Sequence, residues 1–190
     1  MPWDGWIDDP EALQIWGYTS QPSYGPGDTV DLHVATTATT WRYDVRRDGA
    51  TFQQVADESG LLGVKHSVPD DPVADGCGWP VGASFTIPAD WVSGGYTVVL
   101  SGERDGVTVS QDAFFVLRTS RTAPRSKLAF VVATYSWQEY NDWGGGCGYF
   151  SKDFDDQSLD PLLVRETSFR PRMSFQRPWS RGLIRVPVGV

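Results

Sequence analysis

Apolar and polar residues alternate in short runs over most of residues 13–118, and turn residues separate these runs. A period of two is typical of β-strands with one face buried and the other in solvent. Val30, Leu32 and Val34 share one face in the cleanest run, and Trp41, Tyr43 and Val45 do so in another. The pattern predicts strands over residues 13–18, 29–35, 41–46, 84–88, 96–101, 107–109 and 113–117.

Glycine and proline divide these runs, with 20 Gly and 13 Pro along the chain. Asp48-Gly49 and Asp105-Gly106 predict tight turns, since both residue types tolerate positive φ. Residues 57–80 follow neither a helical nor a strand period, which predicts a long loop. Several short strands at this spacing predict a mainly β protein, an antiparallel β-sandwich of immunoglobulin-like or jelly-roll type. We expect residues 1–12 to form an N-terminal arm and residues 13–118 to form the sandwich domain.

The pattern changes after residues 119–126, which are polar and contain a proline typical of a linker. Residues 127–134 are apolar in succession, which predicts a strand buried on both faces. Aromatic and amide residues follow over 135–143, and then three glycines, an arrangement typical of a site at the end of a strand. No second strand of similar quality follows. We therefore expect residues 127–190 to be the incomplete start of an α/β domain.

Composition narrows the possible partners. Nine Trp, nine Phe and seven Tyr provide enough apolar area for a core. The net charge of −8 argues against nucleic acid, because binding phosphate requires a basic surface. The exception is an Arg-rich tail over residues 161–190, which has six Arg and one Glu. It predicts either a solvated loop or a contact with an acidic protein partner or another anion.

Cysteine usage and hydropathy limit the remaining classes. Cys77 and Cys147 are far apart and form no C-x-x-C pair, which excludes a zinc ribbon or a thioredoxin-type site on this chain. The first residues lack the features of a secretory signal, and no apolar run reaches the ~20 residues needed to span a bilayer. We expect a soluble cytoplasmic protein. His33 and His66 have no metal-binding partners at suitable spacing and are predicted to lie at the surface.

The string Trp137-Gln138-Glu139-Tyr140-Asn141-Asp142-Trp143-Gly144-Gly145 resembles the large (β) subunit of N,N-dimethylformamidase and its relatives. A second segment, Ser174-Phe175-Gln176-Arg177-Pro178-Trp179, is similar to an S-F-x-R-P-Y segment of that family. Pro26-Gly27-Asp28, Arg47-Asp48-Gly49 and the residues around Trp91 fit the family's sandwich domain. The resemblance covers about residues 13–181. It implies a sandwich domain followed by the start of a glutamine-amidotransferase-like domain.

The resemblance also implies a hydrolase of small amides that uses one ferric ion (Fe3+) held by two tyrosinates and a carboxylate. Phenolate oxygens are hard anionic ligands, which suit ferric iron. Tyr140 matches the position of the first tyrosinate, and Trp179 stands at the position of the second. Indole has a donor nitrogen only and cannot replace phenolate. The family's carboxylate ligand lies beyond Val190, so the chain retains at most one of the three ligands.

Alternatives remain open at Tyr140. It can equally be a buried tyrosine whose hydroxyl binds the backbone near the glycines. Tyr135 and Tyr149 are weaker candidates for a metal ligand. Glu139 is a carboxylate beside Tyr140, but on a strand the two side chains would point to opposite faces.

Two functions follow from the sequence. The first is a portion of an iron-dependent amidohydrolase that hydrolyses small amides only with the missing α/β remainder or a partner subunit. The second is a non-catalytic β-sandwich module that binds a partner protein or a second copy of the chain, for which the Arg-rich tail is a candidate contact.

Overall fold

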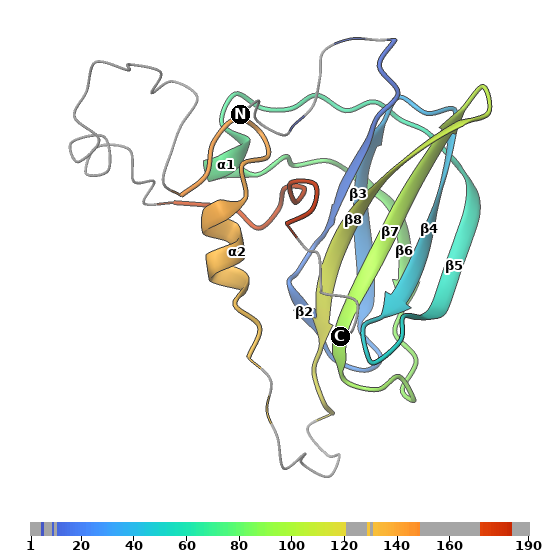
Figure 1. The fold of residues 1–190 in the computed structure, drawn as a ribbon, viewed down its shortest axis with the longest axis vertical. Coiled ribbons are helices and arrows are strands. Elements are labelled where there is room, and N and C mark those ends of the chain that lie inside the picture. The colour runs from blue at the N-terminus through green and yellow to red at the C-terminus, as the bar shows by residue number, and fades with distance from the viewer. Residues whose placement is uncertain are drawn as a thin grey trace.

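The structure is a computed structural model that describes Gly5, Asp9, residues 11–120, Ala129, residues 131–148 and residues 172–183. Its strands form two sheets that pack face to face (Figure 1). One sheet has three strands in the order β1-β3-β6, and the other has five in the order β2-β8-β7-β4-β5. The predicted mainly β fold with an antiparallel sandwich is confirmed.

Most strands pair with antiparallel neighbours, whereas the short β2 pairs in parallel with β8. Among the described residues, no helix has the length and apolar character needed to cross a bilayer. The strands are β1 (Ile15–Thr19), β2 (Ser23–Tyr24), β3 (Thr29–Thr36), β4 (Thr40–Arg47), β5 (Gln53–Leu62), β6 (Val81–Thr86), β7 (Gly94–Arg104) and β8 (Val107–Leu117).

The core of the sandwich consists of the inward side chains of both sheets. Val30, Leu32 and Val34 lie on the inner face of β3 and are at most 4% exposed, as their alternation predicts. Tyr96 of β7 stacks on Phe115 of β8 with ring centroids 5.2 Å apart. Burying one such side chain contributes about 1.5–3 kcal/mol to stability, so these rows of alternating residues specify the sandwich.

The β7–β8 hairpin confirms the turn predicted at Asp105-Gly106. Both residues have positive φ, 54° and 77°, as the central positions of a type I′ turn require. The prediction of a loop over 57–80 is wrong at its start, because β5 runs from Gln53 to Leu62. Two shifts in its register with β4 interrupt the alternation, and its residues are mostly exposed, so the period of two is hidden in the sequence.

The strand predicted over 127–134 is wrong for the residues that the structure describes. Residues 131–133 lie outside any strand, Val131 is 86% exposed, and helix α2 (Thr134–Tyr140) begins where the strand was expected to end. A strand buried on both faces requires neighbours along its edges. The sheets of the described chain contain no strand that pairs with this segment. The domain division and the α/β character of residues 149–171 and 184–190 stay predictions, since those residues lie outside the described part.

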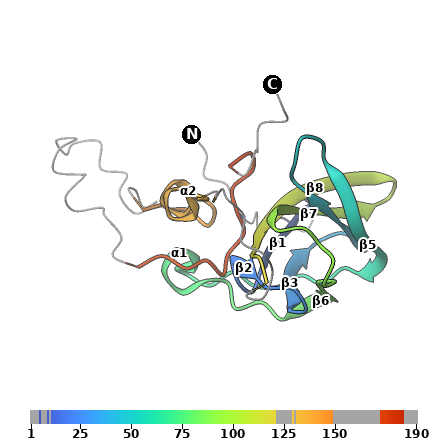
Figure 2. The same cartoon turned by 90° about the horizontal axis from the view of Figure 1, so that it is seen from below.

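Two later segments, residues 131–148 and 172–183, pack on one side of the sandwich, and we call them the C-terminal cover. Figure 2 shows α2 and the short helix α1 (Pro72–Asp75) on this side, with residues 172–183 passing between α2 and the strands. The cover contacts outward side chains of β1 and β8, including Trp16 and Phe114. Both sheets therefore bury aromatic residues on their outer faces here.

Candidate functional site

The segment that carries the family string forms α2 and the turn after it, and α2 has two different sides. Gln138 is 2% exposed, and its Nε2 donates to the backbone carbonyl of Ser174. Tyr140 is 64% exposed on the other side, whereas Tyr135 is 77% exposed on the same side as Gln138, where its ring lies edge-on to Phe175 with centroids 5.8 Å apart. No side chain caps the start of this seven-residue helix. Isolated helices of this length are unstable in water, so the contacts of its buried side keep it folded.

Arg177 is 1% exposed and binds the turn that follows α2. Its guanidinium donates to the carbonyl oxygens of Asn141, at 2.8 Å, and of Trp143, and lies 3.5 Å from that of Gly146. A buried charge is costly unless hydrogen bonds replace its hydration, and the rigid guanidinium can bind several carbonyls at once. Arg177 therefore fixes the path of the backbone immediately after Tyr140.

Asn141 joins the same turn to the other segment of the cover and is 0% exposed. Its Nδ2 donates to the carbonyl of Pro178 at 3.0 Å, and its Oδ1 accepts from the backbone N–H of Ser180 at 2.9 Å. The Ser180 hydroxyl lies 2.9 Å from the same Oδ1 and accepts from the N–H of Asp142. Asn141 thus holds the end of α2 at one position relative to residues 178–180.

Trp143 is 0% exposed and anchors the cover on the three-stranded sheet. Its ring packs edge-on against Trp16 and Trp79, with centroids 5.9 Å and 5.8 Å away. Gly144 follows with φ of +87°, and a Cβ there would lie 2.5 Å from Cγ of Pro72 in α1. Both the conformation and the close approach require glycine at this position.

Cys77 lies in the same cluster as Trp143 and is 8% exposed. Burial raises the pKa of its thiol far above the ordinary value of 9.0, and the nearby charge of Arg177 opposes this only in part. The thiol is therefore neutral at physiological pH, and a neutral buried thiol is a poor nucleophile and metal ligand. Cys147, the other free cysteine, is also buried.

Trp179 occupies the position where the resemblance implies a second tyrosinate, and it is 6% exposed. It packs with Phe114 of β8 in one cluster and lies edge-on to Trp137 and Phe175, with centroids 6.5 Å and 6.3 Å away. The indole therefore fills an apolar contact between the cover and β8. It offers no anionic oxygen to a metal.

Tyr140 projects from the last residue of α2, so the alternative of a buried tyrosine is wrong. Glu139, which precedes it on the helix, is half-buried, and its carbonyl accepts from the N–H of Gly148 at 2.9 Å. Tyr135 is exposed one helical turn before Glu139, and Tyr149 lies outside the described residues.

The fit of an iron ion can be tested on these residues. Within the described ranges, no group of three or more His, Cys, Asp or Glu side chains is placed to hold a metal ion. Tyr140 is one candidate ligand, and Trp179 is buried in an apolar cluster. The described residues therefore do not fit a complete iron site, and iron bound through Tyr140 stays a prediction.

Other residues singled out in the sequence have structural contacts. His33 is half-buried, stacks on Tyr18 at 4.9 Å and binds the carbonyl of Trp79 through Nδ1 at 2.7 Å. In the Arg-rich tail, Arg172 is exposed and lies 3.4 Å from a carboxylate oxygen of Asp75. Arg177 is the buried residue described above, and Arg165, Arg170 and Arg185 lie outside the described residues.

Sequence reasoning missed the structural role of Gln138, Asn141 and Ser180. Gln138 and Asn141 are three residues apart, a spacing that places two side chains on one side of a helix. The side-chain amides of Gln138 and Asn141 at this spacing, with aromatic residues on either side of each, could have indicated a buried polar network. Nothing in the sequence indicated that Ser180 would be the partner of Asn141.

A comparison with protein-family models agrees with the resemblance. The sequence model of the family described as N,N-dimethylformamidase beta subunit-like, C-terminal, matches residues 35–186, which is most of the chain. No curated protein sequence matches. Among solved structures, the chain is similar to a Fn3-like protein from Clostridium thermocellum, with 13% identity and a TM-score of 0.28. The match covers 61% of this chain and 100% of that one.

Proposed function

Because the chain belongs to the N,N-dimethylformamidase beta subunit-like family, we propose that it is a portion of an iron-dependent amidohydrolase. It hydrolyses small amides only together with further protein, either the remainder of an α/β domain or a partner subunit. The family's description as a beta subunit supports a protein partner. A cytoplasmic location remains part of the proposal.

One observation carries this proposal: Tyr140 is exposed directly beside the fully buried Asn141. The hydrogen bonds of Asn141 and Arg177 hold the backbone on the C-terminal side of Tyr140, and Gln138 holds the helix two residues before it. The phenol of Tyr140 is thus presented from an anchored backbone to whatever binds this side of α2. A ligand shared with another chain requires this kind of placement.

The chain's own contribution is therefore limited to positioning one phenol group. Trp179 supplies no ligand and instead keeps residues 174–180 against β8. The other ligands and the catalytic acid or base belong to protein outside the described residues. No step of amide hydrolysis is assigned to this chain alone.

The test is to purify the chain with the proteins encoded beside it and to measure bound iron and release of dimethylamine from N,N-dimethylformamide. We expect both in the assembly, loss of both with Tyr140→Phe, and retention of both with the matched control Tyr135→Phe. An assembly that contains no iron and hydrolyses no formamide contradicts the proposal, as does a Tyr140→Phe assembly that retains its iron.

A second function, a non-catalytic module that binds a partner, is favoured by the exposed apolar residues near α2. Val131, Tyr135 and Tyr140 are each more than 60% exposed. In this case the chain binds its partner without metal, and Tyr135→Glu weakens that association while Tyr140→Phe does not. Light scattering of the purified mixture measures this association. If neither Tyr135→Glu nor Val131→Asp weakens it, this function is contradicted.

A further inference from the structure

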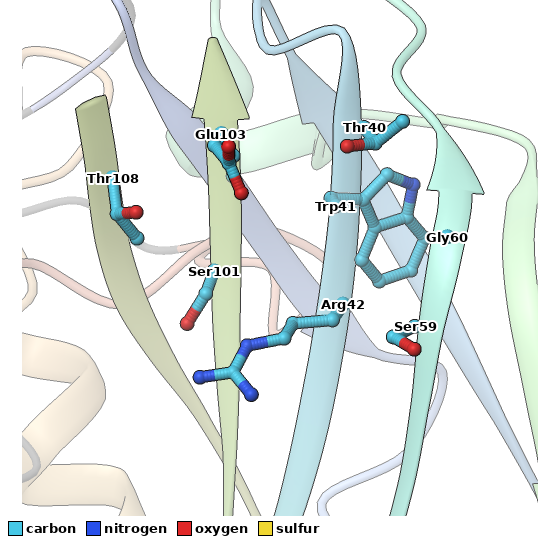
Figure 3. A pocket seen from close by; sticks show the side chains of 9 residues that line it. Thr40, Trp41, Arg42, Ser59, Gly60, Ser101, Glu103 and Thr108 are labelled. Carbon is cyan, nitrogen blue, oxygen red and sulfur yellow. The ribbon is translucent and has the colours of Figure 1, made fainter. Parts of the chain in front are cut away.

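A groove lies on the outer face of the five-stranded sheet, near the β7–β8 turn, and its lining includes no residue of the C-terminal cover (Figure 3). Its volume is about 340 Å³, which is within the range of small-molecule sites. Side chains of register partners point to the same face of a sheet, which places Thr40, Glu103 and Thr108 in one row across β4, β7 and β8. Arg42 and Ser101 form the next row.

A β-bulge in β5 opens one side of the groove. Trp41 pairs with Leu61 and Tyr43 with Glu58, so two residues of β5, Ser59 and Gly60, lie opposite Arg42 alone. Gly60 has φ of +76°, and a Cβ there would have no atom within 4 Å. The bulge therefore leaves open space beside Arg42, where a regular strand would place a side chain. Bulges are over-represented next to active sites.

The groove contains hydroxyl groups that the described chain leaves without hydrogen-bond partners. Thr40, Ser59, Ser101 and Thr108 make no side-chain hydrogen bond to any described residue. Ser101 is only 8% exposed, so its hydroxyl is nearly enclosed and still faces the groove. Four unpaired hydroxyls along one groove are suited to a ligand that both donates and accepts hydrogen bonds.

The charges of the groove are balanced. Figure 3 shows Ser101 between the side chains of Glu103 and Arg42. Arg42 is held by a long contact, with Nη2 3.9 Å from Oδ2 of the buried Asp44, and its side chain is 57% exposed. An anion would meet Glu103 and a cation would meet Arg42. A neutral molecule with several hydroxyls can instead accept from the guanidinium, donate to the carboxylate and pair with the Ser and Thr hydroxyls.

We propose that this groove binds a small neutral polyhydroxyl compound of monosaccharide size. Its lining shares no residue with the C-terminal cover, and the proposal does not depend on the proposed amidohydrolase function. Because the groove is half open to solvent, it encloses only part of such a ligand, and we expect dissociation constants in the millimolar range.

The test is a titration of the ¹⁵N-labelled chain with glucose, galactose, mannose and xylose, followed by two-dimensional NMR. Glycine, inorganic phosphate and formamide are titrated in parallel as zwitterion, anion and neutral amide. We expect at least one sugar to shift the amides around residues 40–42, 59–60, 101–103 and 108. No shift at these residues with any sugar, or a larger response to phosphate, glycine or formamide, overturns the proposal.

Two variants with matched controls localise the site. Arg42→Gln removes charged donors and is expected to weaken sugar binding roughly 10- to 100-fold, whereas Arg46→Gln, which also faces Asp44 from outside the groove, leaves it unchanged. Thr108→Val removes one exposed hydroxyl and is expected to weaken binding roughly 2- to 10-fold, with Thr86→Val on the other sheet as its control. Unchanged affinity in the folded Thr108→Val and Arg42→Gln chains contradicts the assignment.

Discussion

Inside the sandwich, Leu100 and Val98 are buried among other apolar side chains, whereas in the C-terminal cover Arg177 and Asn141 are buried among hydrogen bonds. The sandwich is stabilised by area removed from water, which tolerates repacking. In addition to its aromatic anchors, the cover depends on directional contacts, and the loss of any one of them leaves a buried polar group unsatisfied. Several residues of the Trp137–Gly145 string are therefore buried and hold the cover in place. Tyr140 belongs to the same string but is exposed.

The largest expected effect comes from removing the aromatic anchor of the cover. Trp143→Ala leaves a large cavity against Trp16 and Trp79 and should lower the free energy of unfolding of the cover by about 3–5 kcal/mol. Hydrogen exchange separates the two regions. We expect amides of the cover to lose protection while those of β4 and β7 keep it; Leu100→Ala should instead weaken protection in the sandwich. Equal loss in both regions by Trp143→Ala would contradict a distinct cover.

The second prediction concerns the buried charge. Arg177→Met keeps an unbranched apolar stem but leaves the carbonyls of Asn141 and Trp143 without their donor, at a cost of roughly 3 kcal/mol. Arg181→Met is the matched control: Arg181 is exposed, and its guanidinium lies 4.2 Å from the Trp16 ring centroid, so about 0.5–1 kcal/mol is expected. Urea denaturation measures the free energy of unfolding of both variants. Equal decreases in the two would show that the buried hydrogen bonds of Arg177 contribute no additional stability.

A smaller, pH-dependent effect follows from Cys77. Burial raises the pKa of this thiol in the folded chain above its value of about 9 in the unfolded chain. Below pH 9 the thiol is neutral in both states and its full contribution to stability is present. Above pH 9 the unfolded chain loses the proton first, so the folded state loses stability as the pH rises. The loss amounts to about 1.4 kcal/mol between pH 8 and pH 10. Urea denaturation under reducing conditions should show a flatter pH profile for Cys77→Ala than for the parent chain. Identical profiles would assign the alkaline loss to other groups.

The smallest expected effect is on the exposed side of α2. Tyr140→Phe removes a hydroxyl from a side chain that is 64% exposed, and the free energy of unfolding should change by less than about 0.5 kcal/mol. Asn141→Ala, one residue later, should cost about 2 kcal/mol because three backbone groups lose this partner: the carbonyl of Pro178 and the N–H groups of Ser180 and Trp143. Thermal unfolding of both variants checks this contrast, and a Tyr140→Phe loss as large as that of Asn141→Ala would place Tyr140 in the structural network.

The sandwich could be predicted because its strands are specified locally. The alternation of Val30, Leu32 and Val34 and the Asp105-Gly106 turn each determine their own structure. No strand was predicted at β5, because bulges break its period and its partner β4 supplies the regularity. Residues 131–133 were misassigned for a related reason. An apolar run indicates burial or pairing only if neighbouring elements are available, and here Val131 is exposed.

The candidate site was predicted only in part. The string around Tyr140 was identified, and the exposure of its phenol agrees with a ligand role without testing it. The burial of Trp179 follows from its chemistry, since an indole without a polar partner packs among Phe114 and other aromatic side chains. The partnership of Asn141 with Ser180 spans 39 residues of sequence, and no local pattern encodes a contact at that separation.

The bulges of β5 also affect how the molecule associates. β5 is the outermost strand of its sheet, and among the described strands it pairs with β4 alone. A regular edge of this length would be a template for strands of other chains, which is how many β-proteins aggregate. The two breaks in register, together with the charges of Asp57 and Glu58, prevent an incoming strand from matching the ladder. The molecule therefore resists strand addition at this edge of the five-stranded sheet.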